Sequence, residues 1–275
     1  MDKAKIIYDK LIVEMETGFE GGLLDVTTMD MSYHSNKIEG STLTEDQTVF
    51  LYMHDSIPPD KDVIIKADDV VEMKNHFRLF KEMLKTVNEP LSESMIKQYH
   101  KVLKSGTNDD LVEEWKIGDY KKISNKVGNL ITADPLDVPE EMENLMIPYN
   151  FDSTGKSLSD ILRFHVQFET IHPFQDGNGR VGRMIMFKEC LKNDIIPFII
   201  TENTKNYYYD GLRKYNVEPE YLNKYAGKMQ DEYLSKADYF LPELVNDSLG
   251  EDAAVNESKK SISQKINEAD QQTGT

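Results

Sequence analysis

The chain has 275 residues, of which 39% are hydrophobic, so it is long enough for one large domain or two small ones with a real core. Its formal net charge of −17 and isoelectric point near 4.8 exclude a general affinity for nucleic acid or anionic lipid, because both depend on a basic surface. No apolar run is long enough to span a bilayer, and the first residues lack the apolar stretch of a signal peptide. We therefore expect a soluble cytoplasmic protein without nucleic-acid or membrane partners.

Apolar residues recur at helical spacing along most of the chain. Over residues 69–85 and 92–104 they fall on one face, which predicts two core-facing helices. No repeat of fixed period appears, and strands do not alternate with helices as a doubly wound sheet requires. The sequence therefore predicts a mostly α fold.

Three internal segments interrupt the helical pattern. Residues 56–62 (SIPPDKD) are a proline-marked connector, and residues 118–139 are rich in β-formers, which indicates a short hairpin or an ordered loop. Residues 195–200 (IIPFII) form a short apolar run that suits either a strand or a buried helix. From about residue 246 the chain is polar, and we expect a loosely attached tail with room for one helix over residues 258–269.

The cysteine and histidine residues outside the central motif predict no metal site. The single cysteine, Cys190, lies in an apolar helical pattern, so we expect a core residue rather than a nucleophile. Five histidines lack metal-binding spacing and are expected to pack or to lie at the surface: His34, His54, His76, His100 and His165. The last of these lies seven residues before His172 on the same helical face, where it would support that residue.

The segment HPFQDGNGRVGR, residues 172–183, satisfies the glycine spacing of a dinucleotide-binding turn. In such a turn a strand runs almost directly into the first glycine, whereas Pro173 and three further residues intervene here. The preceding apolar residues fit a helix that begins after Ser157 or Ser159 equally well. A dinucleotide fold is therefore the weaker alternative.

The same segment predicts a loop that binds an anion beside catalytic groups. A helix delivers His172 to the loop, and residues 177–179 form a turn before a new helix, whose free N–H groups and dipole favour an anion. Arg180 and Arg183 are spaced to reach phosphate oxygens, and Asp176 is placed to hold a hard cation such as Mg²⁺. Because histidine titrates near neutral pH, His172 supplies a base for a hydroxyl. These groups suit the transfer of a phosphoryl or nucleotidyl group onto a hydroxyl.

Residues 172–183 resemble the signature of the Fic family, H-[PA]-F-x-[DE]-G-N-G-R-x-x-R, at every specified position. Further similarity extends the resemblance over about residues 30–245, in the segments EMKNHF, MIKQYHKVL, GDYKK and NYYYDGL. One departure is Lys121, where the family often has arginine. The resemblance implies a helical bundle with a short β-hairpin flap. It also implies an enzyme that transfers AMP from ATP to a Ser, Thr or Tyr hydroxyl of a protein and releases pyrophosphate.

The resemblance implies a role for each motif residue. His172 is the general base and Asp176 holds Mg²⁺. Arg180 holds phosphate, and Arg183 holds the γ phosphate. Phe174 is buried and orients the loop. The nest for the α and β phosphates comprises Gly177, Asn178 and Gly179.

The resemblance also implies contacts with the two substrates. The hairpin around residues 126–132 is similar to the family's flap, which pairs with the backbone of the target protein as an added strand. Its central residues are Val127, Gly128, Asn129 and Leu130. Among three consecutive tyrosines we expect Tyr208 to contact the nucleotide, because an aromatic face binds a base without strict geometry. ATP and a protein substrate are the implied partners, and self-modification and a homodimer are left open.

A second motif, SNKIEG over residues 35–40, resembles the inhibitory sequence [ST]-x-x-x-E-[GN] of many Fic proteins. Ser35 and Glu39 lie on one helical face, and Gly40 is the residue type that ends a helix in a left-handed turn. A carboxylate at a helix C-terminus needs a cation opposite, and the resemblance makes Arg183 that cation. We therefore expect Glu39 to take Arg183 from the γ phosphate, so that ATP binds unproductively. The alternative is a solvent-exposed glutamate before a cap glycine.

The predicted organisation has three parts: N-terminal helices with the inhibitory motif over residues 1–60, a catalytic core over residues 61–245, and a polar tail over residues 246–275. The prediction is an autoinhibited protein adenylyltransferase with Mg²⁺ as cofactor and ATP as co-substrate. One alternative keeps the fold but moves another phosphate-containing group or removes AMP. A second alternative is a catalytically silent regulator that binds a nucleotide.

Overall fold

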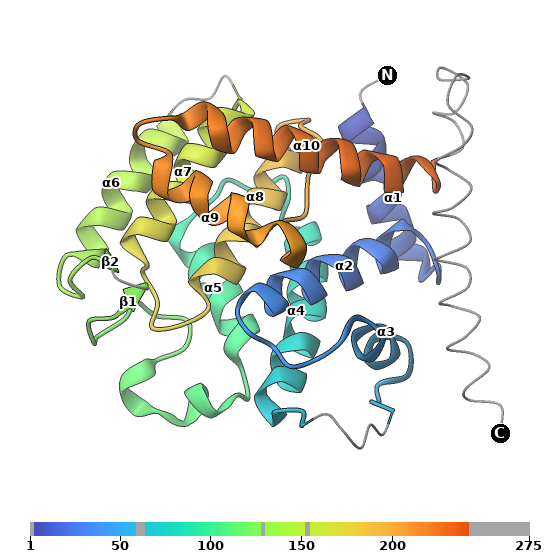
Figure 1. The fold of residues 1–275 in the computed structure, drawn as a ribbon, viewed down its shortest axis with the longest axis horizontal. Coiled ribbons are helices and arrows are strands. Elements are labelled where there is room, and N and C mark those ends of the chain that lie inside the picture. Colours follow the sequence, from blue (N-terminus) through green and yellow to red (C-terminus); the bar gives the residue numbers. More distant parts are fainter. Residues whose placement is uncertain (1–2, 59–63, 128–129, 152–154, 242–275) are drawn as a thin grey trace.

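Helices make up most of the computed structural model, which describes residues 3–58, 64–127, 130–151 and 155–241 (Figure 1). The α-helices are α1 (Lys3–Thr17), α2 (Leu23–Ile38), α3 (Glu45–His54), α4 (Ala67–Lys85), α5 (Glu93–Lys104), α6 (Val138–Phe151), α7 (Leu158–Ile171), α8 (Asn178–Lys192), α9 (Lys205–Lys214) and α10 (Pro219–Asp238). Short 3₁₀ turns are η1 (Asn108–Leu111), η2 (Glu113–Trp115) and η3 (Glu202–Thr204). The predicted mostly α fold is confirmed.

The hairpin segment contributes two short strands, β1 (Lys126–Val127) and β2 (Leu130–Ile131). They pair antiparallel, with Val127 opposite Leu130. Gly128 and Asn129 lie outside the described residues. The assignment of this segment as a flap that binds a target stays a prediction.

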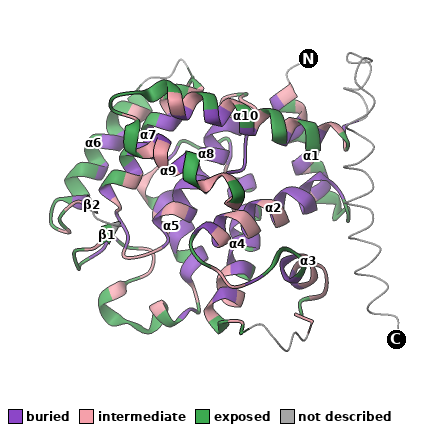
Figure 2. Ribbon diagram, viewed as in Figure 1, coloured by how far each residue is buried: buried purple, intermediate pink, exposed green. Residues whose placement is uncertain are grey.

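Helix α8 lies at the centre of the bundle. Helices α1, α2, α4, α5 and α7 all contact it, and nearly all of its residues are buried. A helix enclosed on every side carries few charged residues unless they are paired. Lys188 and Glu189 on α8 meet this need, because the Lys188 ammonium lies 2.9 Å from the Glu189 carboxylate and also donates to the backbone carbonyl of Glu89. Buried residues gather on the inward faces of the surrounding helices, while much of α6 is exposed (Figure 2).

The two predicted core helices correspond to α4 and α5. Ser92 caps α5, since its hydroxyl accepts a hydrogen bond from the Met95 amide at 3.2 Å. Val70 is the half-buried member of the predicted faces, and the other members are buried: Met73, Phe77, Phe80, Leu84, Met95, Ile96, Tyr99 and Leu103. Cys190 is fully buried within α8, in agreement with its expected core role.

Residues 195–200 are neither of the predicted alternatives. They form an irregular segment that is neither helix nor strand, and Phe198, Ile199 and Ile200 are buried. Pro197 explains the difference, because proline lacks the N–H that a helix or a sheet ladder needs. The apolar run therefore serves the core through its side chains alone.

The element before the glycine-rich motif is a helix, α7. Ser157 and Asp160 form a reciprocal capping box at its start, in which each side chain accepts from the other's backbone amide. No parallel strands occur in the described residues, where β1 and β2 form the one sheet. The dinucleotide-fold alternative is therefore wrong.

Several predicted features fall outside the described residues. These are part of the connector over residues 56–62 and the tail over residues 246–275, with its expected helix over residues 258–269. In the part of the chain that the structure describes, no helix combines the length and apolar character needed to cross a membrane. The predicted boundaries at residues 60 and 245 stay predictions.

Candidate active site

The loop between α7 and α8 is shaped by two left-handed residues. His172 caps the end of α7 with φ of 53°, and its amide donates to the Phe168 carbonyl at 2.9 Å. Gly177 caps the start of α8 with φ of 80°. The helix begins at Asn178, so the turn is shorter than the one predicted over residues 177–179. Residues 173–176 therefore connect His172 to the free amides at the start of α8.

Asn178 and Phe174 hold this loop closed. The Phe174 amide donates to the Asn178 side-chain oxygen, and the Asn178 side-chain nitrogen donates to the Phe174 carbonyl, both at 2.8 Å. Phe174 is fully buried, as predicted, and its ring stacks on His100 with 4.0 Å between centroids. Because the Asn178 side chain is used for loop closure, its backbone amide is the group that it offers to an anion.

His100 connects the loop to the segment before the hairpin. Its Nδ1 accepts from the Gly118 amide at 2.8 Å, so its Nε2 carries the proton and donates to the Asp176 carbonyl at 3.1 Å. Burial lowers the pKa of His100 to about 3, so the imidazole stays neutral. The expected packing role of His100 thus includes fixing the backbone of Asp176.

His172 is half-buried. Burial lowers the pKa of His172 below its ordinary value, and the positive charge of Lys121 acts in the same direction. A neutral imidazole at neutral pH has a free lone pair for a proton. The residue therefore meets the electrostatic requirement of a general base.

Asp176 belongs to a cluster of carboxylates and cations. Its Oδ2 accepts from Lys104 Nζ at 2.7 Å and from Arg180 Nη2 at 2.8 Å. Glu72 pairs with both of these cations, and Asp109 lies 2.5 Å from the Lys104 ammonium. Burial acts to raise the pKa of Asp176, but the charges of Arg180 and Lys104 outweigh it and hold that pKa well below its usual range.

Three of these carboxylates suit a divalent cation. Glu72, Asp109 and Asp176 each offer one oxygen, and the three oxygens lie within 4.8 Å of one another. Carboxylate oxygens are the donors that Mg²⁺ prefers. The predicted ligand Asp176 thus has two acidic neighbours that sequence reasoning missed, and the residues present fit such an ion.

Arg183 is buried and holds the predicted inhibitory motif. Its Nη2 lies 2.7 Å from Glu39 Oε1, its Nε donates to the Ser35 hydroxyl at 2.9 Å, and Nη2 also donates to the Ser35 carbonyl at 3.0 Å. Glu39 directly follows α2, and Gly40 adopts a left-handed φ of 94°, as expected. The structure therefore brings Arg183 of the first motif into contact with Ser35 and Glu39 of the second.

The carboxylate of Glu39 lies against the first turn of α8. A Cβ atom added at Gly179 would overlap Glu39 Oε1, so the glycine permits this approach. The start of a helix favours an anion through its free amides and its dipole. Glu39 thus places a negative group beside the site that the sequence predicts for phosphate.

The burial of Tyr208 argues against its predicted contact with the nucleotide. It is 1% exposed, and its hydroxyl is hydrogen-bonded to His165 Nε2 at 2.7 Å, so no face of its ring is open to a base. Its neighbour Tyr207 is 60% exposed and Tyr209 is half-buried. His165 itself is buried against Gly182, where an added Cβ would lie 3.0 Å from its ring, and its expected support of His172 stays a prediction.

Glu169 is a further charged residue that sequence reasoning missed. It lies one turn before His172, and its Oε1 is the nearest atom to a Cβ built at Gly182, at 2.8 Å. Burial raises the pKa of Glu169 to about 7; the charge of Arg183 opposes this rise and that of Glu39 adds to it. The guanidinium of Arg183 is thus influenced by a second carboxylate besides Glu39.

Lys121 ties the hairpin segment to the loop. Its buried ammonium donates to Thr132 Oγ1 at 2.7 Å, to Asn125 Oδ1 at 2.9 Å and to the Ile171 carbonyl at 3.3 Å. Its backbone amide donates to the Pro173 carbonyl at 2.8 Å. Burial lowers the pKa of Lys121 to about 8. Val127 and Leu130, the described residues of the predicted flap centre, lie in the strands that this lysine supports.

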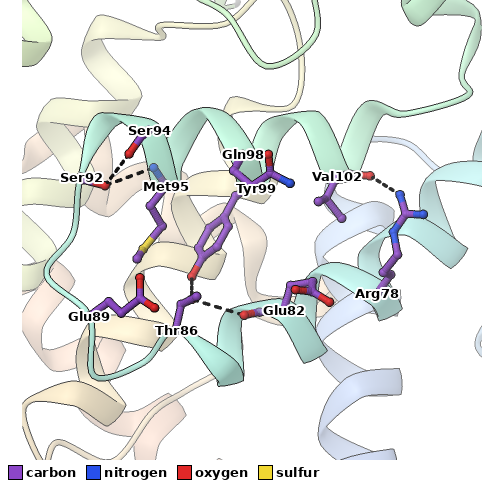
Figure 3. Close-up of a pocket in the computed structure, with 10 residues that line it drawn as sticks. All are labelled: Arg78, Glu82, Thr86, Glu89, Ser92, Ser94, Met95, Gln98, Tyr99 and Val102. Atoms are coloured by element: carbon purple, nitrogen blue, oxygen red, sulfur yellow. Dashed lines mark hydrogen bonds between the residues drawn. The ribbon is translucent and has the colours of Figure 1, made fainter.

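A groove between α4 and α5, of about 460 Å³, shares no residue with the loop or with the inhibitory motif (Figure 3). Arg78 and Val102 lie at one end, and Ser92 and Glu89 lie at the other. Some of its polar groups are bonded to one another, such as the hydroxyls of Thr86 and Tyr99 at 2.6 Å. The groove is therefore separate from the candidate active site.

Residues 90–190 match the model of the Fic/DOC family. The chain is 25% identical over 247 residues to the protein adenylyltransferase fic-1 of Caenorhabditis briggsae, which covers 85% of this chain and 46% of that protein. It is 27% identical over 200 residues to the protein adenylyltransferase Fic of Nematostella vectensis, with 67% and 42% covered. The chain spans less than half the length of these two curated relatives.

Solved structures agree in fold. A Fic domain containing signaling protein from Bacteroides thetaiotaomicron is similar with a TM-score of 0.68 and 23% identity, over 84% of this chain and 96% of that chain. Fic-1 from C. elegans is similar with a TM-score of 0.62 and 19% identity, over 90% and 73%. The segment matched by the family model includes the whole loop from His172 to Arg183. The chain therefore contains a Fic domain of the Fic/DOC family.

Proposed function

We propose that this chain is a protein adenylyltransferase that transfers AMP from ATP to a hydroxyl of a protein, and that Glu39 inhibits it. The observation that carries the proposal is the site around residues 172–183, where a histidine with a lowered pKa, an acidic cluster at Asp176 and an anion-favouring helix start come together. The name protein adenylyltransferase of the curated relatives supports the choice of AMP as the group transferred.

In this proposal His172 is the general base. The substrate hydroxyl loses its proton to the imidazole as its oxygen forms a bond to the α phosphorus of ATP. The bond from that phosphorus to the oxygen of the β phosphate breaks, and pyrophosphate leaves. The lowered pKa of His172, caused mainly by burial, keeps the imidazole available as a base at neutral pH.

The phosphates of ATP would lie at the start of α8. The amides of Gly177, Asn178 and Gly179 supply donors there, and the helix dipole favours negative charge. Asp176, with Glu72 and Asp109 beside it, would hold Mg²⁺, which when bound neutralises charge on the phosphates. Arg180 and Arg183 would hold phosphate oxygens once their present carboxylate partners release them.

Inhibition follows from competition for Arg183. The Glu39 carboxylate already satisfies the guanidinium and lies against Gly179, so a γ phosphate cannot take the same place. ATP then binds in a pose in which the α phosphorus is misaligned with the incoming hydroxyl. Movement of Glu39 frees the guanidinium for phosphate.

The protein substrate would pair with the segment of β1 and β2. An exposed strand edge binds an extended chain through backbone hydrogen bonds. Lys121 and Asn125 fasten this segment to the loop, since the Asn125 side chain donates to the Phe174 carbonyl at 3.0 Å. A chain paired there would carry its hydroxyl toward His172.

Two labels on ATP identify the group transferred. The Glu39→Gly variant is incubated with ATP labelled on either the α or the γ phosphate, alone and with a cell lysate, and labelled protein is counted. AMP transfer leaves only the α label on this chain or on a target. Label from the γ position alone indicates phosphorylation, and the absence of both labels indicates a silent nucleotide binder; either result contradicts the proposal.

A further inference from the structure

The ammonium of Lys104 is enclosed by the acidic cluster of the candidate active site. Lys104 ends α5, and its side chain is only 3% exposed. Its Nζ lies 2.7 Å from Asp176 Oδ2 and 2.5 Å from Asp109 Oδ2, and it also pairs with Glu72. A lysine ammonium has three N–H donors, and three carboxylates here accept them.

These are the same three carboxylates that suit a divalent cation. Because Lys104 pairs with all of them, its ammonium occupies the position that a metal ion shared by the three oxygens would take. Arg180 adds a second positive charge, since it pairs with both Glu72 and Asp176. Two side-chain cations thus already neutralise most of the charge that would attract a metal ion.

The stem of Lys104 passes beside the predicted phosphate position. A Cβ atom added at Gly177, the residue that caps α8, would lie 3.5 Å from Lys104 Cδ. The ammonium is therefore close enough to the start of α8 to exchange a carboxylate for a phosphate oxygen without a change of the backbone.

We propose that Lys104 is a tethered cation that keeps the Asp176 cluster closed to a divalent metal ion until a nucleotide arrives. Without a nucleotide, a metal ion at Asp176 meets the repulsion of Lys104 and Arg180 at short range. The phosphates of a nucleotide give both cations new partners and release carboxylate oxygens for the metal. Lys104 is thus a positioning residue that makes metal binding depend on nucleotide binding.

This inference rests on the proposed function only in its assignment of Asp176 as the metal ligand. A purely structural role for Lys104, joining α5 to η1 and α8, predicts no effect on metal affinity once the protein is folded. Metal affinity in the absence of transfer therefore distinguishes the two roles. It also separates this inference from the proposed function, because no AMP transfer is measured.

The experiment measures Mn²⁺ binding by titration calorimetry, with and without ADP, for the full chain and for Lys104→Met. Methionine keeps the length of the stem and removes its charge. Without ADP, Lys104→Met should bind Mn²⁺ about tenfold or more tightly than the parent. Lys101→Met, which removes an exposed lysine on the same helix, should leave the parent affinity unchanged. Adding Asp176→Asn to Lys104→Met should abolish the gain.

The parent chain supplies a readout that needs no variant. Its affinity for Mn²⁺ should rise by about tenfold or more when ADP is present, even after allowance for the Mn²⁺ that free ADP binds. Equal Mn²⁺ affinities of the parent and of folded Lys104→Met without ADP would overturn the inference. A parent affinity for Mn²⁺ that does not change when ADP is added would also overturn the inference. That measurement uses the parent chain alone, so it does not require that Lys104→Met folds.

Discussion

Arg183 donates to the carboxylate of Glu39 across 2.7 Å, although 144 residues separate them in the chain. The pair joins the end of α2 to α8. Burial acts to lower the pKa of Arg183, but the charge of Glu39 outweighs it and raises that pKa above its ordinary value. A buried guanidinium that loses its partner without a replacement pays a large desolvation cost. The pair is therefore expected to open when another anion, such as a phosphate, takes the place of Glu39.

Replacing His172 by alanine tests the base. In a Glu39→Gly background, His172→Ala should lower the rate of AMP transfer by about 10² to 10⁴-fold, because the hydroxyl loses its proton acceptor. The affinity for ATP, measured by calorimetry, should change by no more than about threefold, since the imidazole acts on the hydroxyl. His54→Ala, on α3, is the matched control and should behave as its background. Transfer by His172→Ala at the rate of the background would show that another group is the base.

Replacing Glu169 by glutamine tests its buried charge. Burial raises the pKa of Glu169 to about 7 from an ordinary value of 4.5, so the folded state holds the proton more tightly than the unfolded state does. The cost of ionising Glu169 in the fold therefore grows as the pH rises from 4.5 to 7. Between pH 5.5 and pH 7.5, Glu169→Gln should gain about 1 to 2 kcal/mol in the free energy of unfolding relative to the parent.

Urea unfolding of both proteins at the two pH values measures this gain. Glu16→Gln, which removes an exposed glutamate from α1, should show the same difference from the parent at both pH values. A difference between Glu169→Gln and the parent that does not depend on pH would mean that Glu169 titrates at an ordinary pKa.

Replacing Lys121 by methionine tests the link between the hairpin segment and the loop. The change removes the donor that serves Thr132, Asn125 and the Ile171 carbonyl, and should lower the free energy of unfolding by about 1 to 3 kcal/mol. Because the hairpin segment keeps only its Asn125 and backbone bonds to the loop, AMP transfer to a protein should fall more than ATP affinity does. Lys122, the exposed next residue, provides a control: Lys122→Met should change neither the free energy of unfolding nor AMP transfer. Equal free energies of unfolding for Lys121→Met and Lys122→Met would contradict the claim that Lys121 links the hairpin segment to the loop.

The loop was predictable because its residues are consecutive. The chemistry of His172, Asp176 and Arg180 needs a turn of fixed length, and that turn appears in the sequence as a motif. The contact between Glu39 and Arg183 was also predicted, but from the pairing of two family motifs. Periodicity places both residues on helices and says nothing about whether those helices meet.

The remaining site residues depend on tertiary contacts. Glu72 and Lys104 lie on α4 and α5, and Asp109 lies in η1, where charged residues usually face solvent. Only the packing of these elements against the loop brings the charges together. Tyr208 shows the same limit, because successive residues of a helix point in different directions and the local sequence of three tyrosines does not reveal which one faces His165.

The rate of AMP transfer by the Glu39→Gly variant tests the central claim most directly. With saturating ATP labelled on the α phosphate and with Mg²⁺, this variant should label protein at least about tenfold faster than the parent, because Arg183 is free for phosphate. Glu20→Gly removes an exposed glutamate just before α2 and should label protein at the parent rate. Equal rates for Glu39→Gly and the parent would contradict the claim that Glu39 inhibits transfer by holding Arg183.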